Sequence, residues 1–183
     1  TTPRGRVTAN RVVLAIYAWA AQLPELRRSL VTVSYSVATT PVMTERLEQT
    51  GFANAPAFNE TRNMINSLRP TVSGRALFGK PGTALSFGGK VSTAHDRDWD
   101  WNLDAERRRR ELDPHYPGLS AAYAWSGPID RTKDGLPFFG RLPGHPDILY
   151  ATGFSGDGVG PCRLAGKVMA AMALDQHDEW ADL

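Results

Sequence analysis

The densest group of residues suited to binding a ligand lies in the segment GFSGDGVGP, residues 153–161. Its glycines allow the backbone to approach a ligand without a Cβ in the way. They are Gly153, Gly156, Gly158 and Gly160. Pro161 predicts the first position of a helix, and a helix N-terminus presents free N–H groups to an anion or an electron-rich ring edge. A plain tight turn between a strand and a helix explains the same segment about equally well.

The neighbouring residues predict a strand before this segment and a helix after it. DILYATG, residues 147–153, is an apolar run of strand length. Leu164, Val168 and Met172 recur at the spacing of one buried helix face. A strand, a glycine turn (residues 153–158) and a helix together form a unit typical of parallel α/β sheets.

Other motifs match catalytic or metal sites only in part. Residues 74–80, GRALFGK, have the spacing of a phosphate-binding loop, but Pro81 stands where magnesium binding needs serine or threonine. Ser155 lies in GFSGD, which lacks the final glycine of a hydrolase nucleophile elbow. The four histidines lack metalloprotease spacing, and Cys162 is the only cysteine. A P-loop, an acyl-transfer site and a metal centre are therefore disfavoured.

Composition indicates an ordinary globular protein. The 183 residues suffice for one domain or one large lobe, with 42% hydrophobic and 22% charged residues. No apolar run approaches the roughly 20 residues of a membrane span, and TTPRGR lacks the apolar core of a signal peptide. We therefore expect a cytoplasmic protein without a membrane span. The net charge of +2 and the arginine run at residues 107–110, on a predicted solvated helix, do not indicate a nucleic-acid partner.

The middle of the chain predicts an antiparallel sheet. In VTVSYSVATT the residues Val31, Val33, Tyr35 and Val37 alternate, which is typical of a half-buried strand. RALFG, ALSFGGKV and AYAWSG predict further short strands separated by glycine and proline turns. The continuous apolar run Val12 to Ala15 predicts a buried strand. The fold class expected is α+β, with a predominantly antiparallel sheet, flanking helices and terminal segments of α/β character.

Three elements within residues 124–161 together are more specific than any glycine turn alone. They are W-x-G at 125–127, D-G-L-P-x-x-G at 134–140, and a strand leading into G-F-S-G-x-G-V at 153–159. This segment resembles the C-terminal signature of flavin-dependent amine oxidoreductases of the D-amino-acid oxidase superfamily, which includes sarcosine oxidase, glycine oxidase and γ-glutamylputrescine oxidoreductase. RVVLAIYAW, residues 11–19, resembles the V-V-L-A-T-x-A-W strand of that family. Residues 68–79 resemble a stretch of its substrate domain.

The resemblance implies FAD as the cofactor and a division of the chain into three parts. Residues 1–30 would be a returning segment of the FAD-binding domain, residues 31–125 the substrate domain, and residues 126–183 a strand, loop and helix that complete the FAD-binding domain. The residues that match family positions near the flavin are Ala15, Gly135, Leu136, Pro137, Gly153, Phe154, Ser155, Gly156, Gly158 and Val159. Asp157 departs from the histidine often found there, and we expect its side chain to turn away from the flavin.

The resemblance also implies that further polypeptide belongs to the site. Family members begin with a G-x-G-x-x-G segment that holds the ADP part of FAD, and we expect a missing N-terminal FAD-binding segment of this kind as the partner of this chain. The intact protein would then be more than twice as long. The fragment alone is expected to be inactive.

The function implied is oxidation of a C–N bond in an amino acid, amine or aminophosphonate by hydride transfer to FAD. The sequence names no catalytic residue, since the cofactor carries the chemistry. Arg69 is the candidate for binding a substrate carboxylate, because a guanidinium pairs well with a planar carboxylate. Ser86 matches the place of an oxygen-activating lysine in some oxidases, with Lys90 nearby, so oxidase and dehydrogenase both stay open. A non-catalytic binding module that keeps the fold without the cofactor is the alternative.

Overall fold

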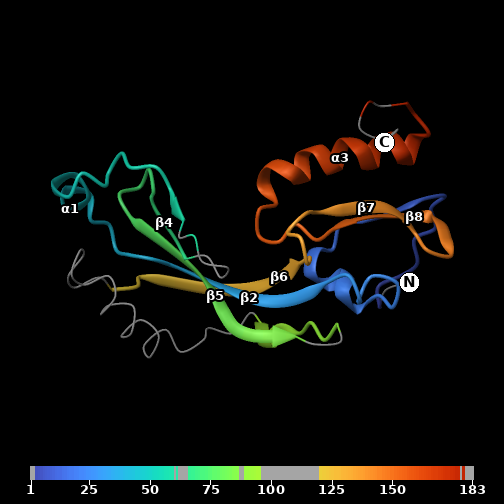
Figure 1. The fold of residues 1–183 in the computed structure, drawn as a ribbon, viewed down its shortest axis with the longest axis horizontal. Coiled ribbons are helices and arrows are strands. Elements are labelled where there is room, and N and C mark those ends of the chain that lie inside the picture. The colour runs from blue at the N-terminus through green and yellow to red at the C-terminus, as the bar shows by residue number, and fades with distance from the viewer. Residues whose placement is uncertain are drawn as a thin grey trace. The chain divides into compact units, whose positions relative to one another are not determined.

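A computed structural model describes residues 3–59, 61, 66–86, 89–95, 120–177 and 179 (Figure 1). The helix predicted around the arginine run at 107–110 lies outside the described residues. The chain forms two compact units. The first unit comprises Thr1–Thr32, Ser86–Val91 and Ile129–Leu183, and the second comprises Val33–Leu85 and Ser92–Pro128. Their assignment as FAD-binding and substrate domains remains a prediction.

The first unit is built on a three-stranded sheet with the order β1-β8-β7. Its strands are β1 (Val12–Leu14), β7 (Phe138–Leu142) and β8 (His145–Thr152). β1 runs parallel to β8, whereas β7 runs antiparallel to it. The predicted strand before the glycine turn is therefore confirmed as β8, and it is the central strand of this sheet.

The two faces of β8 pack against different elements of the first unit. Leu149 and Ala151 face α3 (Val159–Leu174), where they form a core with Ala165, Val168 and Met169. Figure 1 shows α3 lying along β7 and β8. On the alternate positions, Ile148 and Tyr150 pack against a cluster from the 3₁₀-helix η1 (Tyr17–Gln22) and the residues after it. That cluster consists of Ala20, Ala21, Leu26, Leu30, Val91 and Leu142.

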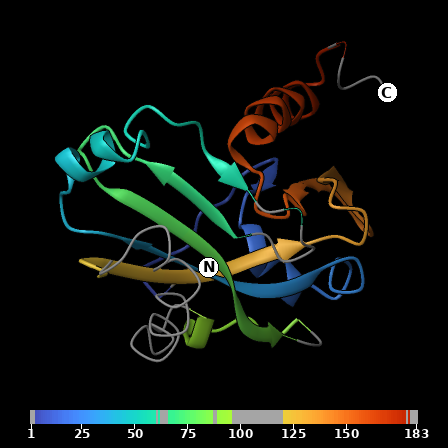
Figure 2. The same cartoon turned by 60° about the vertical axis from the view of Figure 1, so that its left-hand side comes forward.

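The second unit is built on a five-stranded sheet with the order β3-β4-β5-β2-β6. The strands are β2 (Val31–Thr39), β3 (Phe58–Asn59), β4 (Ser67–Pro70), β5 (Ala76–Ser86) and β6 (Tyr123–Arg131). In Figure 2, β5 is the long green strand of this sheet. Helix α1 (Thr44–Gln49) contributes Leu47 to a small core with Phe52 and Ala76, and the 3₁₀-helix η2 spans Thr93–His95. The predicted α+β class with a mainly antiparallel sheet is confirmed.

Three local predictions are wrong. The segment Val12 to Ala15 is not buried, because β8 is the one strand that pairs with β1 among the described residues, and Val12 and Val13 are 44% and 45% exposed. Residues 76–86 form one strand rather than two, since Pro81 and Gly82 both adopt extended backbone. Helix α3 begins at Val159, so Pro161 occupies the third helical position.

Strand β2 also differs from its apolar pattern. The alternating residues Thr32, Ser34 and Ser36 are buried, whereas Val31 on the opposite face is 48% exposed. Both faces of β2 are therefore largely covered, and the small hydroxyl side chains form the better-covered face. Alternation of valines locates the strand correctly but does not show which of its faces is more deeply buried.

Candidate functional site

The chain leaves β8 through the glycine turn, in which three residues have left-handed backbone. Gly153, Ser155 and Gly156 have φ angles of 80°, 56° and 99°. At Gly153 a Cβ would lie 2.6 Å from Thr132 Cγ2 and 3.0 Å from the Phe138 ring. Glycine is therefore required at 153 both by conformation and by space. Ser155 adopts the left-handed region in spite of its Cβ, which costs about 1–2 kcal/mol and needs compensating contacts.

Those contacts come from the end of β6. The Asp130 carboxylate accepts hydrogen bonds from Thr152 Oγ1 at 2.8 Å and from Gly153 N at 2.5 Å. The Asp130 main-chain oxygen accepts from Ser155 N at 2.9 Å. Thr132 N donates to Ser155 Oγ at 3.3 Å. Asp130, near the end of β6, and Thr132, just after it, both belong to the first unit, and they hold the entry to the turn and its strained residue.

Helix α3 begins immediately after the turn with no side-chain cap among the described residues. Its N-cap is Gly158, whose carbonyl accepts from Cys162 N at 2.8 Å in the first helical turn. The N–H groups at a helix start lack intrahelical partners and carry part of the positive end of the helix dipole. The N–H groups at this end of α3 can donate hydrogen bonds to a carbonyl oxygen or an anionic ring edge.

The predicted D-G-L-P segment lies next to the glycine turn. Thr132 Oγ1 donates to Leu136 O at 3.0 Å and lies 3.4 Å from Ser155 Oγ. Gly135 has φ of 79°, and Asp134 accepts from Leu136 N at 3.0 Å, a hydrogen bond that lowers the pKa of the Asp134 carboxyl. Pro137 precedes β7 directly. Two segments separated in sequence, 135–137 and 153–159, are therefore brought together through Thr132.

Ala15, at the end of β1, lines an apolar pocket of about 400 Å³ in the first unit together with Phe154. Val13, Tyr17, Cys162 and Met169 also line this pocket. Burial, followed by the nearby Asp130 charge, raises the pKa of Tyr17. Phe154 is buried, whereas Val159 is 97% exposed. The pocket is therefore lined by residues from β1 and its end, the glycine turn and α3.

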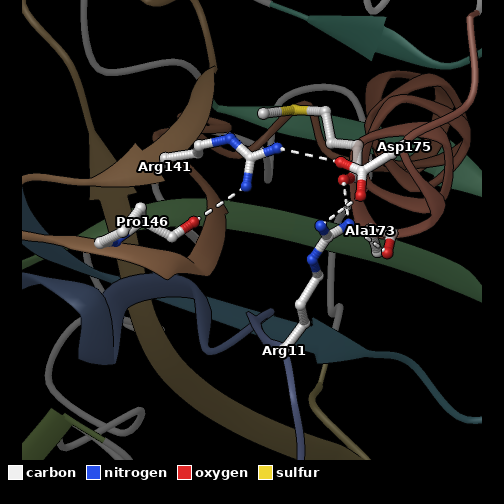
Figure 3. A network of polar contacts seen from close by, with 6 residues as sticks. Arg11, Arg141, Pro146, Ala173 and Asp175 are labelled. Atoms are coloured by element: carbon white, nitrogen blue, oxygen red, sulfur yellow. Dashed lines mark hydrogen bonds and ion pairs between the residues drawn. The ribbon is translucent and has the colours of Figure 1, made fainter.

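An arginine secures the far end of α3. Arg11 Nη1 donates to Met172 O at 3.0 Å and to Ala173 O at 2.6 Å, and its Nη2 pairs with Asp175 (Figure 3). Arg141 lies 3.7 Å from the same carboxylate and donates to Pro146 O at 2.9 Å. The hydrogen bond from Arg11 lowers the pKa of Asp175. Arg11, just before β1, and Arg141, within β7, therefore hold the C-terminal end of the helix whose N-terminus borders the turn.

The remaining predicted residues lie elsewhere. Arg69 is an exposed residue of β4 in the second unit, opposite Leu77 of β5. Ser86 is buried and donates to Lys90 O, while the Lys90 residue itself is exposed. Arg69 thus belongs to a different unit from the glycine turn, and Ser86 bonds within its own segment.

Asp130, Thr132 and Tyr17 are the residues that the sequence analysis missed. The strand YAWSGPIDR gave no signal for Asp130, because its large apolar residues Tyr123, Trp125 and Ile129 alternate on the face opposite to Asp130, although the structure buries the Asp130 face. Among the described residues no group of three or more His, Cys, Asp or Glu side chains is placed to hold a metal ion. No helix in the described part of the chain is long and apolar enough to cross a bilayer.

The residues present fit a flavin. A glycine-lined turn offers backbone within reach of a planar ring, and an uncapped helix start offers N–H groups to its electron-rich edge. Gly156 and Gly160 leave space, since a Cβ at either position would meet no described atom closer than 3.6 Å. The backbone atoms of the turn and the first turn of α3 would hold such a ring.

Residues 1–172 match the family of FAD dependent oxidoreductases named DAO. The chain belongs to this family.

The relatives include curated proteins and solved structures. Over 191 residues the chain is 29% identical to γ-glutamylputrescine oxidoreductase of Escherichia coli, covering 100% of this chain and 41% of that protein. Fructosyl amine:oxygen oxidoreductase (Amadoriase I) of Aspergillus fumigatus shares the fold with a TM-score of 0.73 at 20% identity, covering 98% of this chain and 43% of the other. Glycine oxidase of Geobacillus kaustophilus gives a TM-score of 0.63 at 23% identity, covering 97% and 45%. The chain therefore spans less than half the length of these relatives.

Proposed function

We propose that this chain supplies one part of the FAD site of an oxidoreductase that oxidises a C–N bond in an amine, amino acid or aminophosphonate. The observation that carries the proposal is the pairing of the glycine turn with an uncapped helix start, next to the D-G-L-P turn, in a member of this family. The names of its relatives, a γ-glutamylputrescine oxidoreductase and a fructosyl amine oxidoreductase, support an amine substrate.

FAD when bound supplies the two-electron acceptor, and the chain supplies binding and electrostatics. We assign the turn contacts to Gly153, Phe154, Ser155, Gly156, Gly158 and Val159, with Ala15, Gly135, Leu136 and Pro137 beside them. The start of α3 would stabilise negative charge on the cofactor by about 1–2 kcal/mol, which corresponds to a few tens of millivolts for a two-electron couple. Stabilising this negative charge raises the flavin reduction potential, which favours acceptance of a hydride.

Further polypeptide would complete the site. β1 is an edge strand in the described sheet and runs parallel to β8, and parallel strands normally have both faces covered. Val12 and Val13 are exposed, and the apolar pocket adjoins the same strand. We propose that an FAD-binding segment outside these residues pairs along β1 and covers this surface.

The substrate would be recognised in part by Arg69. Its exposed guanidinium on β4 suits a carboxylate, provided that the substrate carries one. We also propose a cytoplasmic location, on composition alone.

A flavin titration tests the proposal. FAD is added to this chain and, in parallel, to the chain extended by the coding sequence that precedes it, and the visible flavin spectrum is followed. Binding by the extended protein, with turnover of amines and reduction of the flavin, supports the proposal. If neither protein binds FAD, the glycine turn is structural and the chain is a binding module instead.

A further inference from the structure

Asp130 is a wholly buried carboxyl group that the proposed chemistry does not itself require. Its exposed fraction is 0%, and it occupies an inward position of β6. Aspartate is rarely buried to this degree unless its oxygens receive hydrogen bonds. The reason for its burial therefore lies in what it contacts.

All of its described partners belong to the entry of the glycine turn. One carboxyl oxygen accepts from both Thr152 Oγ1 and Gly153 N, and the main-chain oxygen accepts from Ser155 N. These contacts span the residues at which the backbone first turns left-handed. Glycine-rich backbone has many alternative conformations, so such bonds select one of them.

The second carboxyl oxygen, Oδ1, is buried with no hydrogen-bond partner among the described residues. Burial accordingly raises the pKa of the Asp130 carboxyl, in spite of the hydrogen bonds that oppose this shift. A neutral, apolar residue would avoid the cost of burying this oxygen. We therefore attribute the presence of a carboxyl group at this position to the acceptor oxygen that it provides for Thr152 Oγ1 and Gly153 N.

We infer that Asp130 is a positioning residue, which sets the conformation of the glycine turn before any ligand binds and so prepares it for a flavin. The part that concerns flavin rests on the function proposed above. The positioning itself concerns only this chain. What matters is the acceptor oxygen rather than the negative charge or the volume of the side chain.

Three substitutions separate these roles. Asp130→Asn keeps an acceptor oxygen without the charge, whereas Asp130→Val fills similar space without an acceptor. Asp147→Asn is the matched control, because Asp147 is an exposed aspartate at the start of β8, away from the turn. If Asp130→Val does not fold, Asp130→Ser takes its place, since serine is small and its short hydroxyl cannot reach both donors.

Amide hydrogen exchange of the chain without ligand gives the first readout. In Asp130→Val we expect the Gly153 N–H to exchange about 10- to 100-fold faster, while the Leu149 and Val168 amides change less than about 3-fold. In Asp130→Asn and Asp147→Asn the Gly153 amide should stay within about 3-fold of the wild type. Equal protection of Gly153 in Asp130→Val, or its loss in Asp130→Asn, would overturn the inference.

Flavin affinity of the extended protein gives the second readout. Asp130→Val should weaken FAD binding about tenfold or more, and Asp130→Asn should restore it to near the wild-type value. If the wild type binds no FAD, the proposed function fails, and the exchange experiment alone decides on the positioning. If the wild type and Asp130→Val bind FAD equally, the positioning of the turn for flavin is wrong.

Discussion

Replacing Gly153 by alanine tests whether the glycine turn is as tightly enclosed as the structure describes. The substitution adds a methyl group to a residue with φ of 80°, 2.6 Å from Thr132 Cγ2 and 3.0 Å from the Phe138 ring. Left-handed backbone costs a non-glycine residue about 1–2 kcal/mol. Overpacking adds about 1–3 kcal/mol. We expect Gly153→Ala to lower the free energy of unfolding by about 2–5 kcal/mol.

Two other glycines serve as controls. Gly135 has nearly the same φ, 79°, but a Cβ there meets no described atom within 4 Å. Gly135→Ala should therefore cost only the backbone component, about 1–2 kcal/mol. Gly160 lies in α3 with ordinary φ and open space around it, so Gly160→Ala should stabilise the chain by roughly 0.5–1 kcal/mol.

Urea unfolding followed by far-UV circular dichroism measures all three variants against the wild type. The expected order of midpoints is Gly160→Ala, wild type, Gly135→Ala and Gly153→Ala, from highest to lowest. The difference between the Gly153 and Gly135 variants isolates the steric component. Equal losses in these two variants would refute the close packing of Gly153 against Thr132 and Phe138.

Three further predictions concern charge. The pKa of Asp175 is lowered in the fold, so its contribution to stability is present above the ordinary value of 3.8 and is lost as pH falls through the folded pKa. Arg11→Gln removes the main cause of this shift and leaves Arg141, so it should reduce the acid-side dependence measured by urea unfolding. The pKa of Asp130 is raised in the fold, so its contribution to stability is full below the ordinary value of 3.8 and is lost as pH rises through the folded pKa. In Asp130→Asn the urea midpoint of unfolding should therefore change less between pH 4 and pH 8 than in the wild type. Arg69→Gln should raise KM for a carboxylate substrate of the extended enzyme with little change in kcat, whereas equal KM values would exclude Arg69 from substrate binding.

Local patterns predicted those elements whose structure depends on neighbours in sequence. The strand ending at Thr152, the glycine turn and the helix after it all follow from short-range periodicity and glycine chemistry. Of the predicted helix stripe, Val168 is buried, whereas Leu164 and Met172 are half-buried at the edge of the same core. The D-G-L-P turn likewise uses local contacts, since Asp134 and Thr132 both bond to Leu136.

Contacts between distant residues could not be predicted in this way. Asp130 meets Thr152 across 22 residues, and Arg11 meets Ala173 across 162. Nothing in the sequence near either partner identifies the other. The burial of Val12 and Val13 was mispredicted for a related reason, because it depends on how many strands flank β1 rather than on the strand itself.

The first unit combines a restrained turn with an open surface. Asp130 and Thr132 fix the turn through side chains and main chain, and Arg11 fixes the opposite end of α3. The glycine turn and α3 are thus held by contacts within this chain. The edge of β1 and the adjoining pocket, by contrast, leave apolar side chains in water, at a cost of roughly 25 cal/mol for each Å². A segment that covered this surface would gain that free energy on docking, and FAD affinity should therefore depend on the added segment more strongly than on any residue of the turn.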